Sequence, residues 1–119
     1  MKPAGTHILI DIWGADPEVL NDSSLLERIL SEAASGAGLS VLGARFASFS
    51  PQGASGAVLL SESHIAIHTW PEAGFAAVDL FTCGSPESAE TACRAVAARL
   101  GAARVRIHSV ERGGKGGLD

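Results

Sequence analysis

The sequence predicts an α+β fold, in which an antiparallel β-sheet carries two helices on one face. Two amphipathic helical stretches interrupt a series of β-branched and aliphatic segments along the 119 residues. The segments between the helices are joined by connections of only a few residues. Such short connections require antiparallel pairing, because parallel neighbours need a crossover of about a dozen residues. A chain of this length has room for one domain, covering residues 1–119.

The N-terminal half begins with a strand at Thr6–Trp13, which is rich in β-branched and aliphatic residues. A helix is expected from about residue 22 to residue 36, because apolar residues recur there at helical spacing. Ser24 followed by Glu27 fits a capping box at its start. Four strand-like segments follow, Leu39 to Phe49, Gly56 to Leu60, His64 to Trp70 and Phe75 to Cys83.

The second helix is expected after Ser85, which is suited to the N-cap, with Pro86 at the first helical position. Gly101 closes this helix, and a last short strand is expected around Val105 and Ile107. The order of elements is summarised as β-α-β-β-β-α-β. Residues 113–119, which are rich in glycine, are expected to form a flexible tail.

Composition excludes several classes of function. The net charge of -4 argues against a nucleic-acid-binding surface, and no apolar run approaches the ~20 residues that cross a membrane. The two cysteines, Cys83 and Cys93, lie in elements of different type, so reduced thiols and a cytoplasmic location are expected. The sequence has neither a zinc-binding nor a phosphate-binding motif, and we expect no metal ion.

An antiparallel sheet with both helices on one side leaves its other face uncovered. A chain in which 46% of the residues are hydrophobic would gain from covering that face. Packing of two copies face to face is therefore expected, and it predicts a homodimer.

The densest polar cluster is Ser61–His64, with His68 four residues further on. Ser63 with a histidine base would form a nucleophilic pair if the two side chains came within hydrogen-bond distance. A shared metal ion on His64 and His68 is disfavoured, because residues four apart on a strand are ~13 Å apart. The alternative without chemistry is a solvated turn between two strands.

The register of the predicted hairpin adds a thiol to this cluster. If Trp70 and Phe75 close the hairpin, Thr82 lies opposite Ser63 and Cys83 lies opposite Glu62. The even-numbered residues of this strand then share one face, which carries the imidazoles and the indole, while the odd-numbered residues face the helices. The same register places His68 opposite Ala77, so a regular strand cannot bring His68 to Ser63.

Two longer motifs surround this hairpin, SESHIAIHTWPE at residues 61–72 and VDLFTCG at residues 78–84. Together with GTHILIDIWG at residues 5–14, FSPQGASG at residues 49–56 and the late Glu111-Arg112-Gly113, they resemble the short prokaryotic S-adenosylmethionine decarboxylases over nearly the whole chain. The set of motifs is long and ordered, and it is therefore highly specific for this family.

The resemblance implies that the chain is a proenzyme that cleaves itself between Glu62 and Ser63 into a β chain, residues 1–62, and an α chain, residues 63–119. Ser63 would become a pyruvoyl cofactor that forms a Schiff base with the substrate amine and accepts electrons during decarboxylation. In the family, the residue matching His68 is the base for the elimination step of processing. Ser55 matches a position that assists processing, and Cys83 matches the proton donor of the decarboxylation.

The resemblance also implies residues for a small-molecule substrate. Phe49 would stack on adenine, Trp70 would line the pocket, and the Glu72 carboxylate would accept hydrogen bonds from ribose hydroxyls. The alternatives from the residues alone are a core aromatic at Phe49 and an exposed turn acid at Glu72. Two processed units would pack sheet against sheet as an αββα sandwich, with the active sites near the interface.

The sequence departs from the family pattern beside the proposed pocket. Ala47, Ser48 and Ala73 stand where a histidine, a basic residue and a tyrosine are common in the family. Arginine or ornithine therefore remains an alternative substrate for the same machinery. An unprocessed regulatory paralogue is a second alternative, and the joint presence of Ser63, His68 and Cys83 argues against it.

Overall fold

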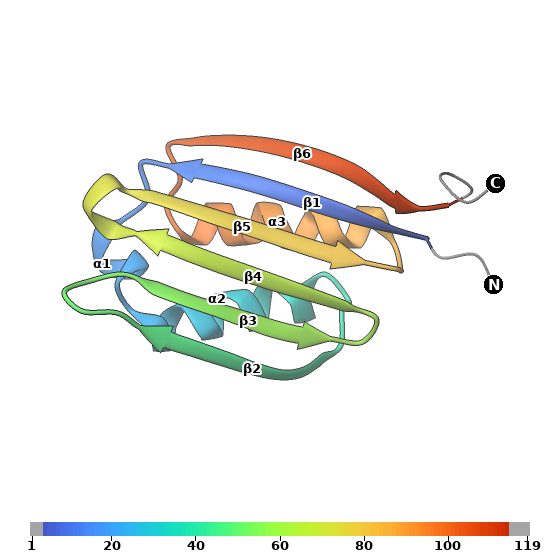
Figure 1. Ribbon diagram of the computed structural model, residues 1–119, viewed down its shortest axis with the longest axis horizontal. Coiled ribbons are helices and arrows are strands. Elements are labelled where there is room, and N and C mark those ends of the chain that lie inside the picture. The colour runs from blue at the N-terminus through green and yellow to red at the C-terminus, as the bar shows by residue number, and fades with distance from the viewer. Residues whose placement is uncertain (1–3, 115–119) are drawn as a thin grey trace.

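The computed structural model describes residues 4–114, in which six strands form one antiparallel sheet and the helices cover one of its faces (Figure 1). The strand order is β2-β3-β4-β5-β1-β6. The strands are β1 (Ala4–Trp13), β2 (Val41–Ser48), β3 (Ala54–Leu60), β4 (Ser63–Trp70), β5 (Phe75–Thr82) and β6 (Arg104–Gly113). The helices are α1 (Pro17–Leu20), α2 (Ser23–Gly36) and α3 (Pro86–Arg99), with a single 3-10 turn η1 over Pro71–Ala73. The predicted α+β class is confirmed.

The summary β-α-β-β-β-α-β is wrong in the number of strands between the two long helices. Four strands, β2 to β5, lie between α2 and α3. The loop between Ser48 and Ala54 separates β2 from β3. β2 pairs with β3, and β3 also pairs with β4, so both are strands of the sheet.

The last strand is longer than the sequence predicted. β6 runs over ten residues and pairs with β1 from Arg104 opposite Trp13 to Gly113 opposite Ala4. Most of its residues are exposed, because it is an edge strand, and an exposed strand lacks the alternation of apolar and polar residues that sequence patterns detect. Gly113 therefore belongs to a strand rather than to a flexible tail, and residues 115–119 of the predicted tail lie outside the described residues.

The helix starts are set by side-chain caps. The Asp22 carboxylate accepts the backbone N–H of Leu25 at 3.0 Å and begins α2, so the predicted capping box at Ser24 is wrong. The start of α3 is confirmed, since Ser85 caps it by accepting the Ser88 N–H. The four-residue helix α1 was not predicted, because it is too short to show a helical period.

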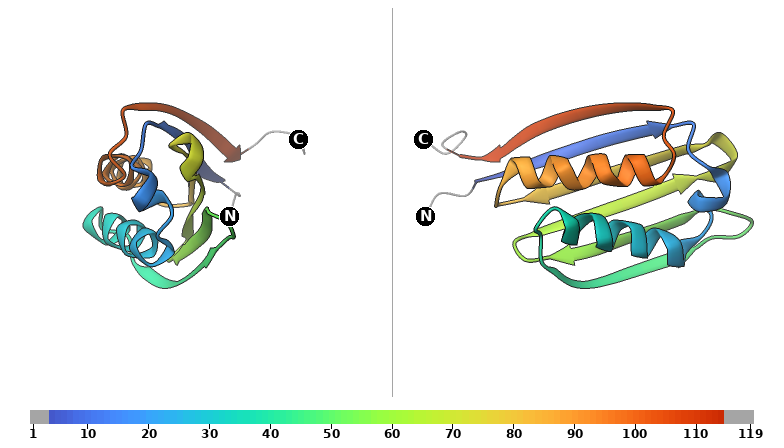
Figure 2. Two further views of the ribbon diagram at one scale, coloured as in Figure 1. Left: turned by 90° about the vertical axis from the view of Figure 1, so that its left-hand side faces the viewer. Right: turned by 180° about the vertical axis from the view of Figure 1, so that it is seen from behind.

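The hydrophobic core lies between the sheet and the helices α2 and α3, which lie side by side on one face of the sheet (Figure 2). Ile65 and Ile67 of β4 are fully buried there, while Ala66 and His68 face the other side of the sheet. This confirms the predicted division of the strand into a core face and an opposite face.

The opposite face of the sheet is not covered by any described element, and we call it the open face (Figure 2). Leu9, Leu59 and Val110 lie on it with 40%, 58% and 43% of their surfaces exposed. Such a group of exposed aliphatic side chains on one face is typical of a surface that packs against another molecule. Within residues 4–114, no helix is long and apolar enough to cross a membrane.

Candidate active site

The turn between β3 and β4 holds its residues in a strained conformation. Glu62 has a φ of 62°, and it is the only residue other than glycine with a positive φ within residues 4–114. The left-handed region costs a residue with a Cβ about 1–2 kcal/mol, and glycine is the usual choice there. The Glu62 carbonyl accepts a hydrogen bond from the backbone N–H of Cys83 at 3.2 Å. The peptide bond between Glu62 and Ser63 therefore follows a residue in an unfavourable backbone conformation and is held at its carbonyl oxygen.

Ser63 is the first residue of β4, and its side chain turns toward the helices. It pairs with Thr82, as the sequence register predicted, and only 8% of its surface is exposed. Its hydroxyl donates a hydrogen bond to Thr82 Oγ1 at 2.7 Å. The solvated-turn interpretation does not hold for this serine, because its hydroxyl is buried and bonded within the protein.

Cys83 directly follows the last residue of β5, and its side chain is exposed. It borders a cavity of about 260 Å³ that is lined by the adjoining ends of β1, β5 and β6, including Glu111 and Arg112. A thiol, the turn with the left-handed Glu62 and an open cavity therefore meet at one end of the sheet.

His68 and Ser55 form a second cluster elsewhere on the sheet. Ser55 Oγ lies 2.7 Å from His68 Nδ1, within hydrogen-bond distance, and the two residues are paired across β3 and β4. His68 lies opposite Ala77, as predicted, and its side chain is exposed on the open face. Five residues of strand, about 16 Å, separate it from Ser63. Within one chain, the fold does not bring His68 to Ser63.

The proposed binding residues lie further still from Ser63. Trp70 ends β4, Glu72 lies in η1, and Phe49 directly follows β2, so all three are near the left-hand end of the sheet in Figure 1. Phe49 and Trp70 are 54% and 45% exposed, and Glu72 is exposed as well. The structure therefore contradicts the alternative in which Phe49 is a core aromatic. The turn at Glu62 lies at the right-hand end, about 23 Å away along β4.

Known proteins with similar sequences agree with the resemblance that the motifs at residues 61–72 and 78–84 indicated. The family described as S-adenosylmethionine decarboxylase matches residues 6–113. The chain belongs to this family. The S-adenosylmethionine decarboxylase proenzymes of Acetivibrio thermocellus and Moorella thermoacetica are 48% and 47% identical to it over 113 residues. These matches cover 95% of this chain in both cases, and 91% and 90% of the respective relatives.

Solved structures give the same result for the fold. The adenosylmethionine decarboxylase from Aquifex aeolicus superposes with a TM-score of 0.87 at 38% identity, covering 95% of this chain and 93% of that one. The Trypanosoma brucei AdoMetDC-delta26 monomer matches with a TM-score of 0.62 at 17% identity, over 86% of this chain and 44% of that one. The second likeness supports the fold alone.

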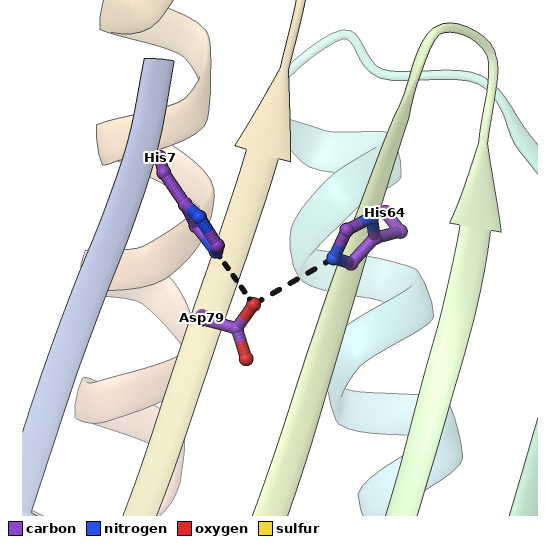
Figure 3. A group of neighbouring side chains, drawn as sticks. All are labelled: His7, His64 and Asp79. Atoms are coloured by element: carbon purple, nitrogen blue, oxygen red, sulfur yellow. Dashed lines mark hydrogen bonds and ion pairs between the residues drawn. The ribbon is translucent and has the colours of Figure 1, made fainter. Parts of the chain in front are cut away.

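One further polar cluster of this decarboxylase-family chain has no signal in its sequence. Figure 3 shows His7 and His64 pointing at the same carboxylate oxygen of Asp79, at 2.9 Å and 3.6 Å. The three residues come from β1, β4 and β5, which are neighbours in the sheet. Only the pairing of β1 with β5 brings them together, and no local motif indicates that pairing.

The three residues form a hydrogen-bonded network, and their possible ligand atoms lie within 4.8 Å of one another, close enough to hold a metal ion. An Arg112 N–H donates to His7 Nδ1 at 3.1 Å, and because a guanidinium group only donates, the proton of a neutral His7 is on Nε2. That proton points at Asp79 Oδ2. A metal ion on Nε2 would require the other tautomer, and the hydrogen bond from Arg112 would be lost.

The two free thiols should differ sharply in reactivity. Burial, reinforced by Asp79 and Glu90, raises the pKa of the Cys93 thiol to about 12, so only ~10⁻⁴ of it is thiolate at pH 8. Cys83 is exposed. Iodoacetamide is therefore expected to modify one cysteine in the folded protein and both after denaturation, as measured by peptide mass spectrometry. Modification of Cys93 in the folded protein would contradict this description of the core.

Proposed function

We propose that this chain is the self-cleaving proenzyme of a pyruvoyl-dependent S-adenosylmethionine decarboxylase. The observation that carries the proposal is the Glu62–Ser63 junction, which follows the left-handed backbone of Glu62 and is hydrogen-bonded at its carbonyl in a chain of this family. The single domain of residues 1–119 would be cut into a β chain, residues 1–62, and an α chain, residues 63–119.

Self-cleavage starts with attack of Ser63 Oγ on the Glu62 carbonyl carbon. The bond from that carbon to the Ser63 nitrogen breaks as an ester bond to Oγ forms, and the hydroxyl proton passes to the nitrogen, which becomes a free amine. The Cys83 N–H already donates to the carbonyl oxygen, and it would stabilise the negative charge that develops there. Elimination across the Cα–Cβ bond of Ser63 then releases the Glu62 carboxylate, and hydrolysis releases ammonia.

The new terminus of the α chain would lie beside Cys83 and the cavity at the ends of β1, β5 and β6. The pyruvoyl group supplies a ketone that draws the electron pair left by departing carbon dioxide. Cys83 is exposed and close to this terminus, so it can carry the proton that the product carbon takes up. The residues present therefore fit the group.

Cys83→Ala is expected to leave self-cleavage intact, because Cys83 contributes its backbone N–H, not its thiol, to the junction. Decarboxylation should fall by about 10²–10⁴-fold, the usual contribution of a positioned acid. Fragment formation on gels and release of labelled carbon dioxide measure the two effects separately. Cys93→Ala is the matched control, and full activity of Cys83→Ala would remove the thiol from the mechanism.

The separation of the two residue clusters supports a homodimer. Ser63 and Cys83 lie at one end of the sheet, whereas His68 with Ser55, and Phe49, Trp70 and Glu72 lie toward the other end. Two open faces packed with a two-fold axis across the strands would bring the first end of each copy against the second end of its partner. Each active site would then combine residues of both copies, in an αββα sandwich.

This arrangement gives the remaining residues their roles. His68 of one copy, held by Ser55, would remove the Cα proton of the other copy's Ser63 during elimination. Phe49, Trp70 and Glu72 would receive the adenine and ribose of the substrate, since their side chains are exposed and free to contact a ligand. We further propose that the enzyme works in the cytoplasm and supplies polyamine synthesis, in particular that of spermidine.

Carbon dioxide release from S-adenosylmethionine, arginine and ornithine, assayed in parallel with processed protein, tests the substrate. We expect turnover of S-adenosylmethionine alone. If the protein turned over arginine or ornithine but not S-adenosylmethionine, the pocket changes at Ala47, Ser48 and Ala73 would have altered the substrate specificity. A processed protein that turns over none of the three would contradict the proposed function.

A further inference from the structure

Thr82 is the only side chain that the structure places in hydrogen-bond contact with the Ser63 hydroxyl within residues 4–114. It is the last residue of β5, it lies directly opposite Ser63, and 1% of its surface is exposed. Two donors reach its Oγ1, the Ser63 hydroxyl at 2.7 Å and the backbone N–H of Gly84 at 2.9 Å.

The hydrogen-bond capacity of a hydroxyl determines what this contact does. A threonine oxygen has two acceptor lone pairs, and here Ser63 and Gly84 occupy both. The contact with Thr82 holds Ser63 Oγ at 2.7 Å from Thr82 Oγ1 and so fixes the position of the oxygen that attacks. Ser63 is buried, so Thr82 is the partner that orients its hydroxyl.

Two consecutive residues, Thr82 and Cys83, thus hold the two groups that react with each other. The Thr82 side chain holds the oxygen that attacks, and the Cys83 backbone N–H holds the carbonyl that is attacked. Gly84 in turn fixes Thr82 through its own N–H. Reactions of this kind depend strongly on such positioning, and a displacement of 1 Å can lower a rate by about 10².

We propose that Thr82 is a positioning residue for self-cleavage, whose hydroxyl orients Ser63 Oγ for attack on the Glu62 carbonyl. The inference rests on the proposed self-cleavage and adds to it a residue that controls the first step, ester formation. In this proposal Thr82 acts in ester formation, whereas His68 acts in the later elimination step.

Thr82→Val keeps the shape of the side chain and removes the hydroxyl, and it is expected to slow cleavage about 100-fold. Thr82→Ser restores the hydroxyl and should cleave within a few-fold of the wild-type rate. Thr69→Val is the matched control. Thr69 is also buried, with its hydroxyl bonded to Ala54 N–H and to the Leu20 carbonyl, but it lies near the far end of β4.

The measurements are the half-time of cleavage on denaturing gels and the melting temperature of each variant. We expect Thr69→Val to lose thermal stability but to form the ester at the wild-type rate, measured as cleavage in the presence of hydroxylamine, whereas Thr82→Val should be slow in that step. If the role of Thr82 were purely structural, both variants would lose stability and neither would be slow in ester formation. Hydroxylamine, which splits esters, should speed cleavage of His68→Ala but not of Thr82→Val, because the latter forms little ester.

Cleavage of folded Thr82→Val at the rate of Thr69→Val would overturn the inference and leave the proposed function standing. Failure of the wild-type chain to cleave would instead overturn the proposed function. If Thr82→Val does not fold, the pair Thr82→Ala and Thr82→Ser, which differ by one oxygen atom, carries the comparison. Equal rates for that pair would also overturn the inference.

Discussion

Ser63→Ala is expected to remain a single chain of 12.2 kDa without decarboxylase activity, because it lacks the oxygen that attacks Glu62. The change removes one buried hydroxyl and leaves Cβ in place, so the fold should survive. Both the cleavage and the cofactor should be lost completely, since the pyruvoyl group has no other source in the proposal. Intact mass spectrometry and the carbon dioxide assay measure the two losses.

Ser61→Ala is the matched control for this variant. Ser61 lies in the same turn, two residues away, and it is exposed. We expect it to cleave at the wild-type rate. Cleavage of Ser63→Ala at the same position would mean that another nucleophile performs the reaction.

The second large effect concerns the proposed sharing of the active site between copies. His68→Ala alone should accumulate uncut chain, because its elimination step has no base. When it is co-expressed with Ser63→Ala, the His68→Ala chain should be cut, since its Ser63 would face the intact His68 of the partner. Different tags on the two chains identify which one is cut on a gel.

A partner that carries both substitutions provides the control, because it has no His68 to offer and should not rescue cleavage. His68 is exposed, so His68→Ala does not disturb the core, and Ser63→Ala removes a single buried hydroxyl. Isolated heterodimers in which the His68→Ala chain stays uncut would contradict the shared site. Rapid cleavage of His68→Ala expressed without the Ser63→Ala chain would contradict it as well.

The sequence predicted the arrangement around Ser63 because a short loop connects β4 to β5. The 3-10 turn at Pro71–Ala73 leaves one register for the hairpin, and a slip by one residue would move Ile65 and Ile67 out of the core. The contacts of Ser63 with Thr82 and of Glu62 with Cys83 follow from that register.

Other features could not be predicted, because they depend on partners distant in the sequence. β6 is a strand because it pairs with β1 along its length. Its residues are mostly exposed, so the sequence shows no alternation of apolar and polar residues there. The network of His7, His64 and Asp79 requires β1 and β4 to lie on either side of β5. The conformation of Glu62 also could not be predicted, since glycine or asparagine is the usual signal for a positive φ.

The intact mass of the purified wild-type chain, followed over time, tests self-cleavage at Ser63 most directly. We expect two fragments, residues 1–62 and residues 63–119, the second beginning with a ketone that borohydride reduces and lacking a free α-amine. A single species that stays at 12.2 kDa after long incubation of the folded protein would contradict the account.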